Sequence, residues 1–329
     1  MNAPAPDDVL RWGILGAARI AENFVGPALS RSPHCNVHAV ASRRHEAAQR
    51  IAGAVGAPQT YPDYRALLAD PDVDAVYIAL PNAMHTEWTL AALAAGKHVL
   101  CEKPLTTTLH DAEAIRSAAR EAGRVAAEAF MYRTHPQLAT LVRQIRDGAI
   151  GEVHSVEAAL SFVLDDPADI RMSGDLGGGA LLDLGCYIAD AANLVYGGPP
   201  VAGTSIRHRG ETGVDLHTCG VLDYGQGRTA QLSASFLLPW HDSQLVVRGD
   251  KGSLTIDHCF NPGTSDGRLT LLTVDGQRET TTFPGVDMYE RMVDRFAHAV
   301  SGRGEPHITL DESVDVQQAL TLLTAPPHR

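Results

Sequence analysis

The sequence has few cysteines, no excess of basic residues and no long hydrophobic run. Its five cysteines are widely scattered and include no C-x-x-C pair, which argues against a disulfide framework or a thiolate zinc site and favours a reducing compartment. The 27 basic and 39 acidic residues give a net charge of −12, which argues against a nucleic-acid or anionic-membrane partner. No apolar stretch reaches the roughly 18 residues of a membrane helix, and no basic segment leads into an apolar run at the N-terminus. We therefore expect a cytoplasmic protein.

A length of 329 residues, with about 150 residues in a typical domain, predicts two domains. In residues 1–130, short apolar runs alternate with longer helical patterns. The run 74–80 (DAVYIAL) is typical of a strand buried on both faces of a parallel sheet. Such alternation predicts a parallel sheet wound by right-handed crossovers.

The pattern changes after residue 130. A helix is predicted at 136–146 and a strand at 153–163. Between residues 201 and 283, β-type runs are separated by turn pairs such as Tyr224-Gly225 and Asp275-Gly276. Strands joined in this way indicate a mostly antiparallel sheet. Two helical patterns, at 289–300 and 311–323, close the chain.

The first predicted strand runs into Gly16-Ala17-Ala18-Arg19-Ile20-Ala21. A dinucleotide fingerprint has glycine at the tight turn and small residues at two later places, which Ala18 and Ala21 occupy here. Taken alone, the segment fits an ordinary strand-to-helix turn equally well. Its position in the first βα unit, where a helix N-terminus can receive phosphates, favours a dinucleotide site that includes Gly16, Ala18, Arg19 and Ile20.

The second strand ends in Ser42-Arg43-Arg44, at the position that meets the adenosine ribose. An acidic residue there would bind the ribose 2′-hydroxyl and select NAD. A hydroxyl and two guanidinium groups suit a 2′-phosphate instead, so the sequence favours NADP(H) over NAD(H). The alternative is a pair of solvated surface arginines.

The segments Pro81-Asn82-Ala83-Met84-His85 and Glu102-Lys103-Pro104 each follow a predicted strand. Together they resemble the Gfo/Idh/MocA family of NAD(P)-dependent oxidoreductases. The resemblance implies an α/β fold: a Rossmann NADP-binding domain in 1–130, and an α+β domain with an open, mostly antiparallel sheet in 131–310. The second domain would bind substrate and form a homodimer or homotetramer through its sheet. We further expect the last helix, about 311–329, to pack back on the first domain.

A second motif opens with three glycines and runs Gly177-Gly178-Gly179-Ala180-Leu181-Leu182-Asp183-Leu184-Gly185-Cys186-Tyr187. On a helix, Asp183 and Tyr187 are four apart and share one face. Tyrosine at position 187, together with residues 130–133 and 136–137, resembles the branch that contains glucose–fructose oxidoreductase, dihydrodiol and D-xylose dehydrogenases and nucleotide-linked 3-ketosugar reductases.

Hydride transfer at a carbinol carbon needs a partner that moves the hydroxyl proton. We predict that Tyr187 is this acid/base, and that the Lys103 ammonium favours its phenolate and binds the substrate oxygen. Asp183 would orient the substrate or Lys103. The alternatives are a packing tyrosine and a surface lysine. The resemblance also implies a cis Lys103–Pro104 bond that aims Lys103 at the nicotinamide.

Further residues are candidates by position. At the cofactor they are Leu80, Pro81, Asn82, His85, Glu102 and Lys103. At the substrate they are Tyr132, Arg133, Phe162, Arg171, Asp183 and Tyr187, and Trp240 (in Pro239-Trp240-His241-Asp242) could stack on a sugar. His85 is equally well explained as a hydrogen-bonding residue at a helix start, and Arg171 as a salt-bridged surface residue. The histidines show no H-E-x-x-H spacing, and we expect no catalytic metal.

The sequence therefore predicts an NADP(H)-dependent oxidoreductase acting on a sugar or polyol. Two substrates of the same class stay open: a nucleotide-linked 3-ketosugar, which needs a basic rim that only Arg133 and Arg171 suggest, and a trans-dihydrodiol. Two other classes are an NAD-dependent glycoside hydrolase, which retains its cofactor, and a cofactor-sensing regulator.

Overall fold

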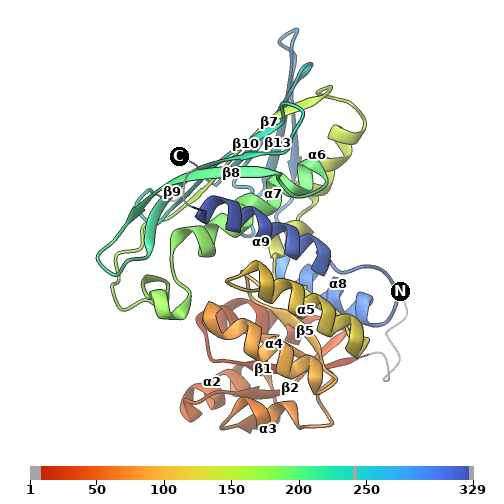
Figure 1. Ribbon diagram of the computed structural model, residues 1–329. Coiled ribbons are helices and arrows are strands. Elements are labelled where there is room, and N and C mark those ends of the chain that lie inside the picture. Colours follow the sequence, from red (N-terminus) through yellow and green to blue (C-terminus); the bar gives the residue numbers. More distant parts are fainter. Residues whose placement is uncertain (1–8, 240–242, 326–329) are drawn as a thin grey trace. The chain divides into compact units, whose positions relative to one another are not determined.

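The computed structural model describes residues 9–239 and 243–325 and divides the chain into two compact units (Figure 1). The first unit contains residues up to Thr106, His110–Met131 and Asp287–Asp311. The second contains Thr107–Leu109, Tyr132–Val286 and the chain from Glu312. The sugar-stacking hypothesis for Trp240 falls on residues 240–242, which lie outside the described residues.

The first unit is built on a parallel sheet with the strand order β3-β2-β1-β4-β5-β6, which is the doubly wound order of a Rossmann domain. All four residues of β4 are buried, which explains the continuous apolar run. The strands are β1 (Leu10–Leu15), β2 (Cys35–Ala41), β3 (Gln59–Tyr61), β4 (Ala75–Ile78), β5 (His98–Cys101) and β6 (Ala126–Glu128). The helical segments are η2 (Ala21–Val25), α1 (Gly26–Arg31), α2 (His45–Val55), α3 (Tyr64–Leu68), η3 (Asn82–Met84), α4 (His85–Ala94), α5 (Leu109–Ala122) and α8 (Met288–Val300).

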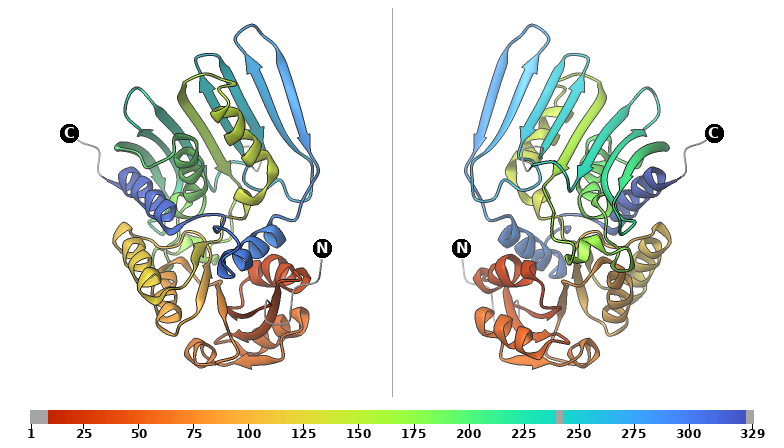
Figure 2. Two further views of the ribbon diagram at one scale, coloured as in Figure 1. Left: turned by 90° about the vertical axis from the view of Figure 1, so that its right-hand side faces the viewer. Right: turned by 90° about the vertical axis from the view of Figure 1, so that its left-hand side faces the viewer.

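The second unit is built on a sheet with the order β14-β13-β12-β11-β7-β10-β9-β8. Every neighbouring pair is antiparallel except β7 with β10, so the predicted mostly antiparallel sheet is confirmed. The strands are β7 (Val153–Ser161), β8 (Ala202–Arg209), β9 (Asp215–Asp223), β10 (Thr229–Ser235), β11 (Gln244–Gly249), β12 (Gly252–Asp257), β13 (Gly267–Thr273) and β14 (Arg278–Phe283). Helices α6 (Pro136–Arg146) and α7 (Cys186–Tyr196) lie on one face of this sheet (Figure 2). Shorter helical segments are η4 (Met131–Thr134), η5 (Ile170–Met172), η6 (Gly174–Leu176) and η7 (Leu181–Gly185).

The expectation that the last helix returns to the first domain is corrected by the structure, because α8 makes that return. The ring of Phe296 on α8 lies 5.1 Å from that of Trp12 on β1, and Arg31 pairs with Glu290 at 3.1 Å. The segment 287–311, expected in the second domain, therefore belongs to the first unit.

The last helix, α9 (Leu310–Thr324), packs on the second unit from Glu312 onward. Gln318 donates to the Pro200 carbonyl at 3.1 Å and Ser205 donates to that of Leu323 at 2.5 Å. A Cβ on Gly220 of β9 would lie 2.5 Å from Leu323, so the absence of a side chain lets the helix approach the sheet. Asp311, at the start of this helix, belongs to the first unit and accepts from Arg116 there at 3.1 Å.

Among the described residues, no helix combines the length and the apolar character that crossing a membrane requires.

Candidate active site

In the first unit, the carboxyl ends of the parallel strands meet at one edge of the sheet, which is where dinucleotides bind in such folds. Gly16 follows β1 at this edge with φ +104°, and a Cβ there would lie 2.3 Å from the Ala79 carbonyl oxygen. Only glycine therefore fits the turn, and its small size brings the turn against the end of β4. The helix that follows begins at Arg19 and includes the π-helical turn η2, so Ala18, Arg19 and Ile20 form its entrance. Helix entrances favour anionic groups.

The second strand delivers Ser42, Arg43 and Arg44 to the same edge. Ser42 is buried and its hydroxyl accepts from the Arg44 backbone N–H at 3.2 Å. Arg43 and Arg44 are exposed. The Arg44 guanidinium reaches the Ala17 carbonyl at 3.3 Å, so the predicted phosphate-binding residues and the Gly16 turn lie together.

The side chain of His85 is enclosed by the protein. It is fully buried, and its Nδ1 and Nε2 each lie 2.8 Å from a carbonyl oxygen, of Pro104 and Leu80 respectively. Burial lowers the pKa of His85, which favours the neutral ring. A neutral ring carries a single N–H, so His85 donates to one of these two carbonyls while it packs between the end of β4 and the loop after β5, as the helix-start alternative describes. A contact with the cofactor stays a prediction.

The loop after β5 carries Glu102, Lys103 and Pro104. The Lys103–Pro104 bond is cis, which confirms that prediction. One Glu102 carboxylate oxygen accepts from the Tyr77 hydroxyl at 2.5 Å, and the other accepts from the Lys103 backbone N–H at 3.3 Å. The buried tyrosine and His85 thus fix both sides of this loop. Leu80, Pro81 and Asn82 form the neighbouring loop after β4.

In the second unit, Asp183 and Tyr187 are both nearly buried, at 7% and 6% exposed. Asp183 lies in the π-helical turn η7 and Tyr187 in the first turn of α7. An α-helical face was expected, and the wider turn between the two residues is a feature often found at functional sites. Asp215, which the sequence did not point to, holds this helix entrance. Its Oδ2 accepts from the Leu181 N–H at 2.8 Å and from the Thr218 hydroxyl at 2.7 Å.

Arg171 and Phe162, both predicted at the substrate, come together with Asp183. The Arg171 guanidinium is held by Asp169 through two bonds of 2.8 Å and lies 3.8 Å from an Asp183 carboxylate oxygen. It also stacks over the Phe162 ring at 5.1 Å. The charge of Arg171 is therefore already compensated by its own neighbours.

Tyr132 is enclosed by the protein, and the guanidinium of Arg133 is paired with carboxylates. Tyr132 is fully buried and its hydroxyl donates to Asp190. The Arg133 side chain is 6% exposed and is held by Asp190 at 2.5 Å and by Glu312 at 2.7 Å. The buried carboxylate of Asp190 on α7 and the partly exposed carboxylate of Glu312 on α9 engage the polar groups of these two residues, and a substrate contact stays a prediction.

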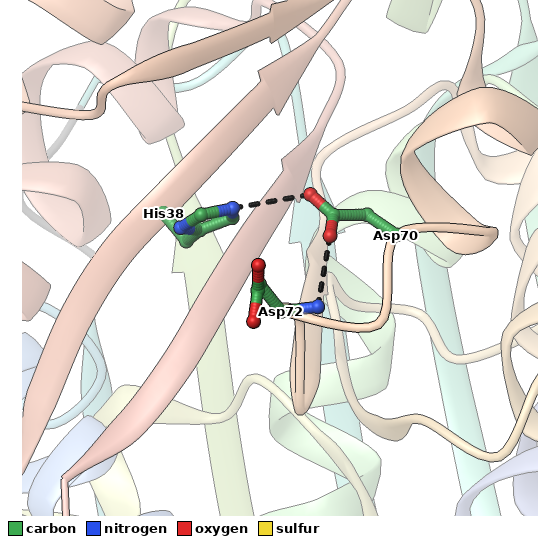
Figure 3. A group of neighbouring side chains, drawn as sticks. All are labelled: His38, Asp70 and Asp72. Atoms are coloured by element: carbon green, nitrogen blue, oxygen red, sulfur yellow. Dashed lines mark hydrogen bonds and ion pairs between the residues drawn. The ribbon is translucent and has the colours of Figure 1, made fainter.

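Within the described chain, one group of three potential metal-ligating side chains gathers, formed by His38, Asp70 and Asp72 (Figure 3). Asp70 accepts from the Tyr61 hydroxyl at 2.9 Å and lies 3.1 Å from His38 Nε2. Asp72 pairs with Arg11 at 2.6 Å. Asp70 and Asp72 precede β4, at the sheet edge opposite the Gly16 turn. Because nearby donors already satisfy these carboxylates, we assign the group a structural role.

Comparison with known proteins covers nearly the whole chain. Residues 10–130 match the model of the oxidoreductase family with an NAD-binding Rossmann fold, and residues 138–255 match the GFO/IDH/MocA C-terminal domain. A D-xylose 1-dehydrogenase (NADP(+)) of Haloferax volcanii is 40% identical over 313 residues, covering 94% of this chain and 95% of that protein. A dTDP-3,4-didehydro-2,6-dideoxy-α-D-glucose 3-reductase of Actinomadura kijaniata is 36% identical over 315 residues, covering 95% and 94%.

A solved structure extends the similarity to the fold. The 3-ketoreductase KijD10 of Actinomadura kijaniata, in complex with NADP and TDP-benzene, superposes with a TM-score of 0.88 at 34% identity, covering 96% of this chain and 97% of that one. Sequence and fold thus agree over both units, and the protein belongs to the Gfo/Idh/MocA family of oxidoreductases.

Proposed function

We propose that this protein is an NADP(H)-dependent oxidoreductase that interconverts a hydroxyl and a carbonyl group of an uncharged sugar or polyol. The observation that carries the proposal is the placement of its arginines. Arg43 and Arg44 are exposed beside the Gly16 turn, whereas Arg133 and Arg171 are paired with carboxylates. Positive charge is thus available to a cofactor phosphate and not to a substrate phosphate.

The residues of the first unit fit a phosphorylated dinucleotide. The Gly16 turn leaves no room for a side chain, the helix entrance after it favours anions, and the Ser42–Arg44 segment supplies donors suited to a 2′-phosphate. The nicotinamide supplies or accepts the hydride at its C4. The loops after β1, β2, β4 and β5 bind and orient this cofactor.

Three side chains, Tyr187, Lys103 and Asp183, serve the proton transfer. Tyr187 gives a proton to the substrate oxygen, or takes one from it, as hydride moves at the same carbon. Lys103 donates a hydrogen bond to that oxygen and favours the phenolate form of Tyr187. Asp183 orients the substrate hydroxyls, with Arg171 beside it.

The relatives include enzymes of a free sugar and of a nucleotide-linked sugar, at similar identity. The excess of acidic residues near η7 in the second unit favours a free sugar as the substrate. The segment that leads to η7 contains Asp165, Asp166, Asp169 and Asp175 but only one cation, Arg171. A cavity of about 410 Å³ lies along it, lined by residues 167–170, 172–176 and Thr212. Neither Asp183 nor Tyr187 is among the lining residues, so the cavity lies beside the proposed reacting groups and does not contain them. Its carboxylates, Asp169 and Asp175, would oppose a pyrophosphate that lay along this segment, and they offer hydrogen-bond acceptors to sugar hydroxyls.

The open face of the second sheet supports the expected homodimer or homotetramer. This face exposes Ile206, at 82% of its surface, together with Val221 and Cys219. A groove of about 620 Å³ crosses it over β7 to β11. A second copy would cover this apolar strip. All five cysteines are free, which supports a reducing, cytoplasmic location.

The first experiment is a fluorescence titration of the purified protein with NADPH and with NADH, after a test for nucleotide already bound. We expect exchangeable NADPH to bind more tightly than NADH. Turnover with a panel of free aldoses and NADP⁺ follows, beside a dTDP-linked ketosugar with NADPH. Turnover of the dTDP-linked sugar alone would overturn the uncharged-substrate proposal, and nucleotide that never exchanges would point to the hydride-recycling hydrolases.

A further inference from the structure

Tyr132, Arg133 and Asp190 form a connected set of polar side chains next to Tyr187, and the chemistry assigned above does not use it. Tyr132, on η4, donates its hydroxyl hydrogen to Asp190 Oδ2. Arg133 forks onto the same carboxylate, with Nε 2.8 Å from Oδ2 and Nη2 2.5 Å from Oδ1. Asp190 is fully buried. Tyr132 and Asp190 therefore offer a substrate no surface, and any role they have must act through other groups.

The Tyr132 ring connects this set to Tyr187. The two ring centroids are 5.7 Å apart with planes at 64°, an edge-to-face arrangement. Phe260 lies against both rings, at 5.2 Å from Tyr132 and 6.0 Å from Tyr187. Such pairs have a preferred geometry, so the direction of the Tyr187 ring depends on where Tyr132 is held. Asp190 also lies on α7, one turn beyond Tyr187, so its hydrogen bond with Tyr132 links the Tyr132 ring to the helix that carries Tyr187.

Tyr132 cannot itself serve as the proton carrier. Burial, and next the charge of Asp190, raise the pKa of Tyr132 well above its ordinary value. Its hydroxyl therefore remains a donor to Asp190 at any working pH. Tyr187, in contrast, keeps 6% of its surface exposed.

We propose that Asp190 and Tyr132 are positioning residues for Tyr187. The carboxylate fixes the Tyr132 hydroxyl, and the Tyr132 ring holds the Tyr187 ring in the direction in which its hydroxyl meets the substrate oxygen. This proposal rests on the acid/base role of Tyr187 proposed above. Displacing a reacting group slows the chemical step more than it weakens the binding of either substrate, so kcat is the sensitive quantity.

The test is Tyr132→Phe, which removes the hydroxyl and keeps the ring. We expect kcat to fall about tenfold, the size of one hydrogen bond to a charged group, with unchanged affinity for NADPH in the fluorescence titration. In a Tyr187→Phe background the same change should lower the residual kcat no further, because the group being positioned is already gone.

Tyr224→Phe is the matched control. The Tyr224 hydroxyl donates to Asn193 on the same helix at 2.7 Å and is similarly buried, but its ring packs on Tyr196. It should lose comparable thermal stability and retain kcat.

The proposal is overturned if Tyr132→Phe retains full kcat, if it lowers kcat by the same factor in both backgrounds, or if Tyr224→Phe matches it. If Tyr187→Phe alone retains full turnover, the acid/base assignment fails first, and that single variant reveals it.

Discussion

In the first unit Arg43 and Arg44 are exposed beside the turn that follows β1, whereas in the second unit Arg133 and Arg171 are each held by carboxylates. An exposed guanidinium can bind a phosphate when one arrives. A guanidinium already forked onto a carboxylate instead fixes the elements that carry the two groups. Under the proposed function, Arg43 and Arg44 bind a cofactor phosphate, whereas Arg133 and Arg171 hold parts of the second unit together.

The largest effect expected from this difference is on stability. Arg133→Ala leaves the buried Asp190 carboxylate without its cation, and such a loss costs about 3–5 kcal/mol. We expect the urea midpoint of unfolding to fall accordingly, while Arg44→Ala changes stability by less than about 0.5 kcal/mol. The double variant Arg133→Met/Asp190→Asn should recover much of the loss. Equal effects of Arg133→Ala and Arg44→Ala would remove the distinction between the two arginines.

The proposed role of Arg43 and Arg44 in cofactor binding is tested by measuring the affinities for NADPH and NADH. Replacing Arg43 and Arg44 together by Ala should weaken NADPH about 10- to 100-fold, the range for lost hydrogen bonds to a charged group, and leave NADH binding nearly unchanged. Fluorescence titration measures both affinities. A parallel loss of both nucleotides would show that the arginines shape the site without reading the phosphate.

Acid should destabilise the first unit through the buried side chain of His98. Burial lowers the pKa of His98 to about 4, and Arg124 adds to this, while His98 Nδ1 accepts the Val125 N–H at 2.9 Å. The folded first unit binds this proton less readily than the unfolded chain does. The contribution of neutral His98 is therefore complete above pH 6.5 and lost as pH falls toward 4, on the order of 2 kcal/mol. Urea unfolding at pH 7 and pH 4.5 should show a smaller acid loss in His98→Gln than in the parent protein. An unchanged pH dependence would contradict it.

The smallest effect concerns the substrate side. Asp169→Asn removes the carboxylate that holds Arg171 and one negative charge near the cavity. We expect inhibition by dTDP to strengthen by about three- to fivefold, because the partly exposed Arg171 guanidinium loses its carboxylate partner. Asp275→Asn, in the turn between β13 and β14, is the control and should leave inhibition unchanged. Tight inhibition of the parent protein by dTDP would contradict the assigned substrate charge.

The features that could be predicted from the sequence lie mainly in short stretches of adjacent residues. The Gly16 turn, the Ser42–Arg44 segment and the cis Lys103–Pro104 bond come from short loops whose function depends on adjacent residues. Apolar runs such as that of β4 reveal burial directly. These features lie mostly in the first unit.

The features that could not be predicted join distant segments. Nothing near Arg133 indicates that Asp190 and Glu312 will surround it, and Asp215 is separated by many residues from the helix entrance that it holds. Both closing segments show a helical pattern in the sequence, and their partners, Trp12 for α8 and Gly220 for α9, decide which unit each one joins. The π-helical turn before Tyr187 likewise has no local signal in the sequence.

The parallel pairing of β7 with β10 bears on how the second unit is made. β7 is a central strand, yet both of its neighbours, β10 and β11, are synthesised well after it. Until they emerge, it has two unsatisfied edges and an apolar face. Long-range pairings of this kind slow folding and leave edges open to other chains. We therefore expect refolding of the second unit to be limited by the docking of β10 and β11 on β7, and aggregation during synthesis to begin at this strand.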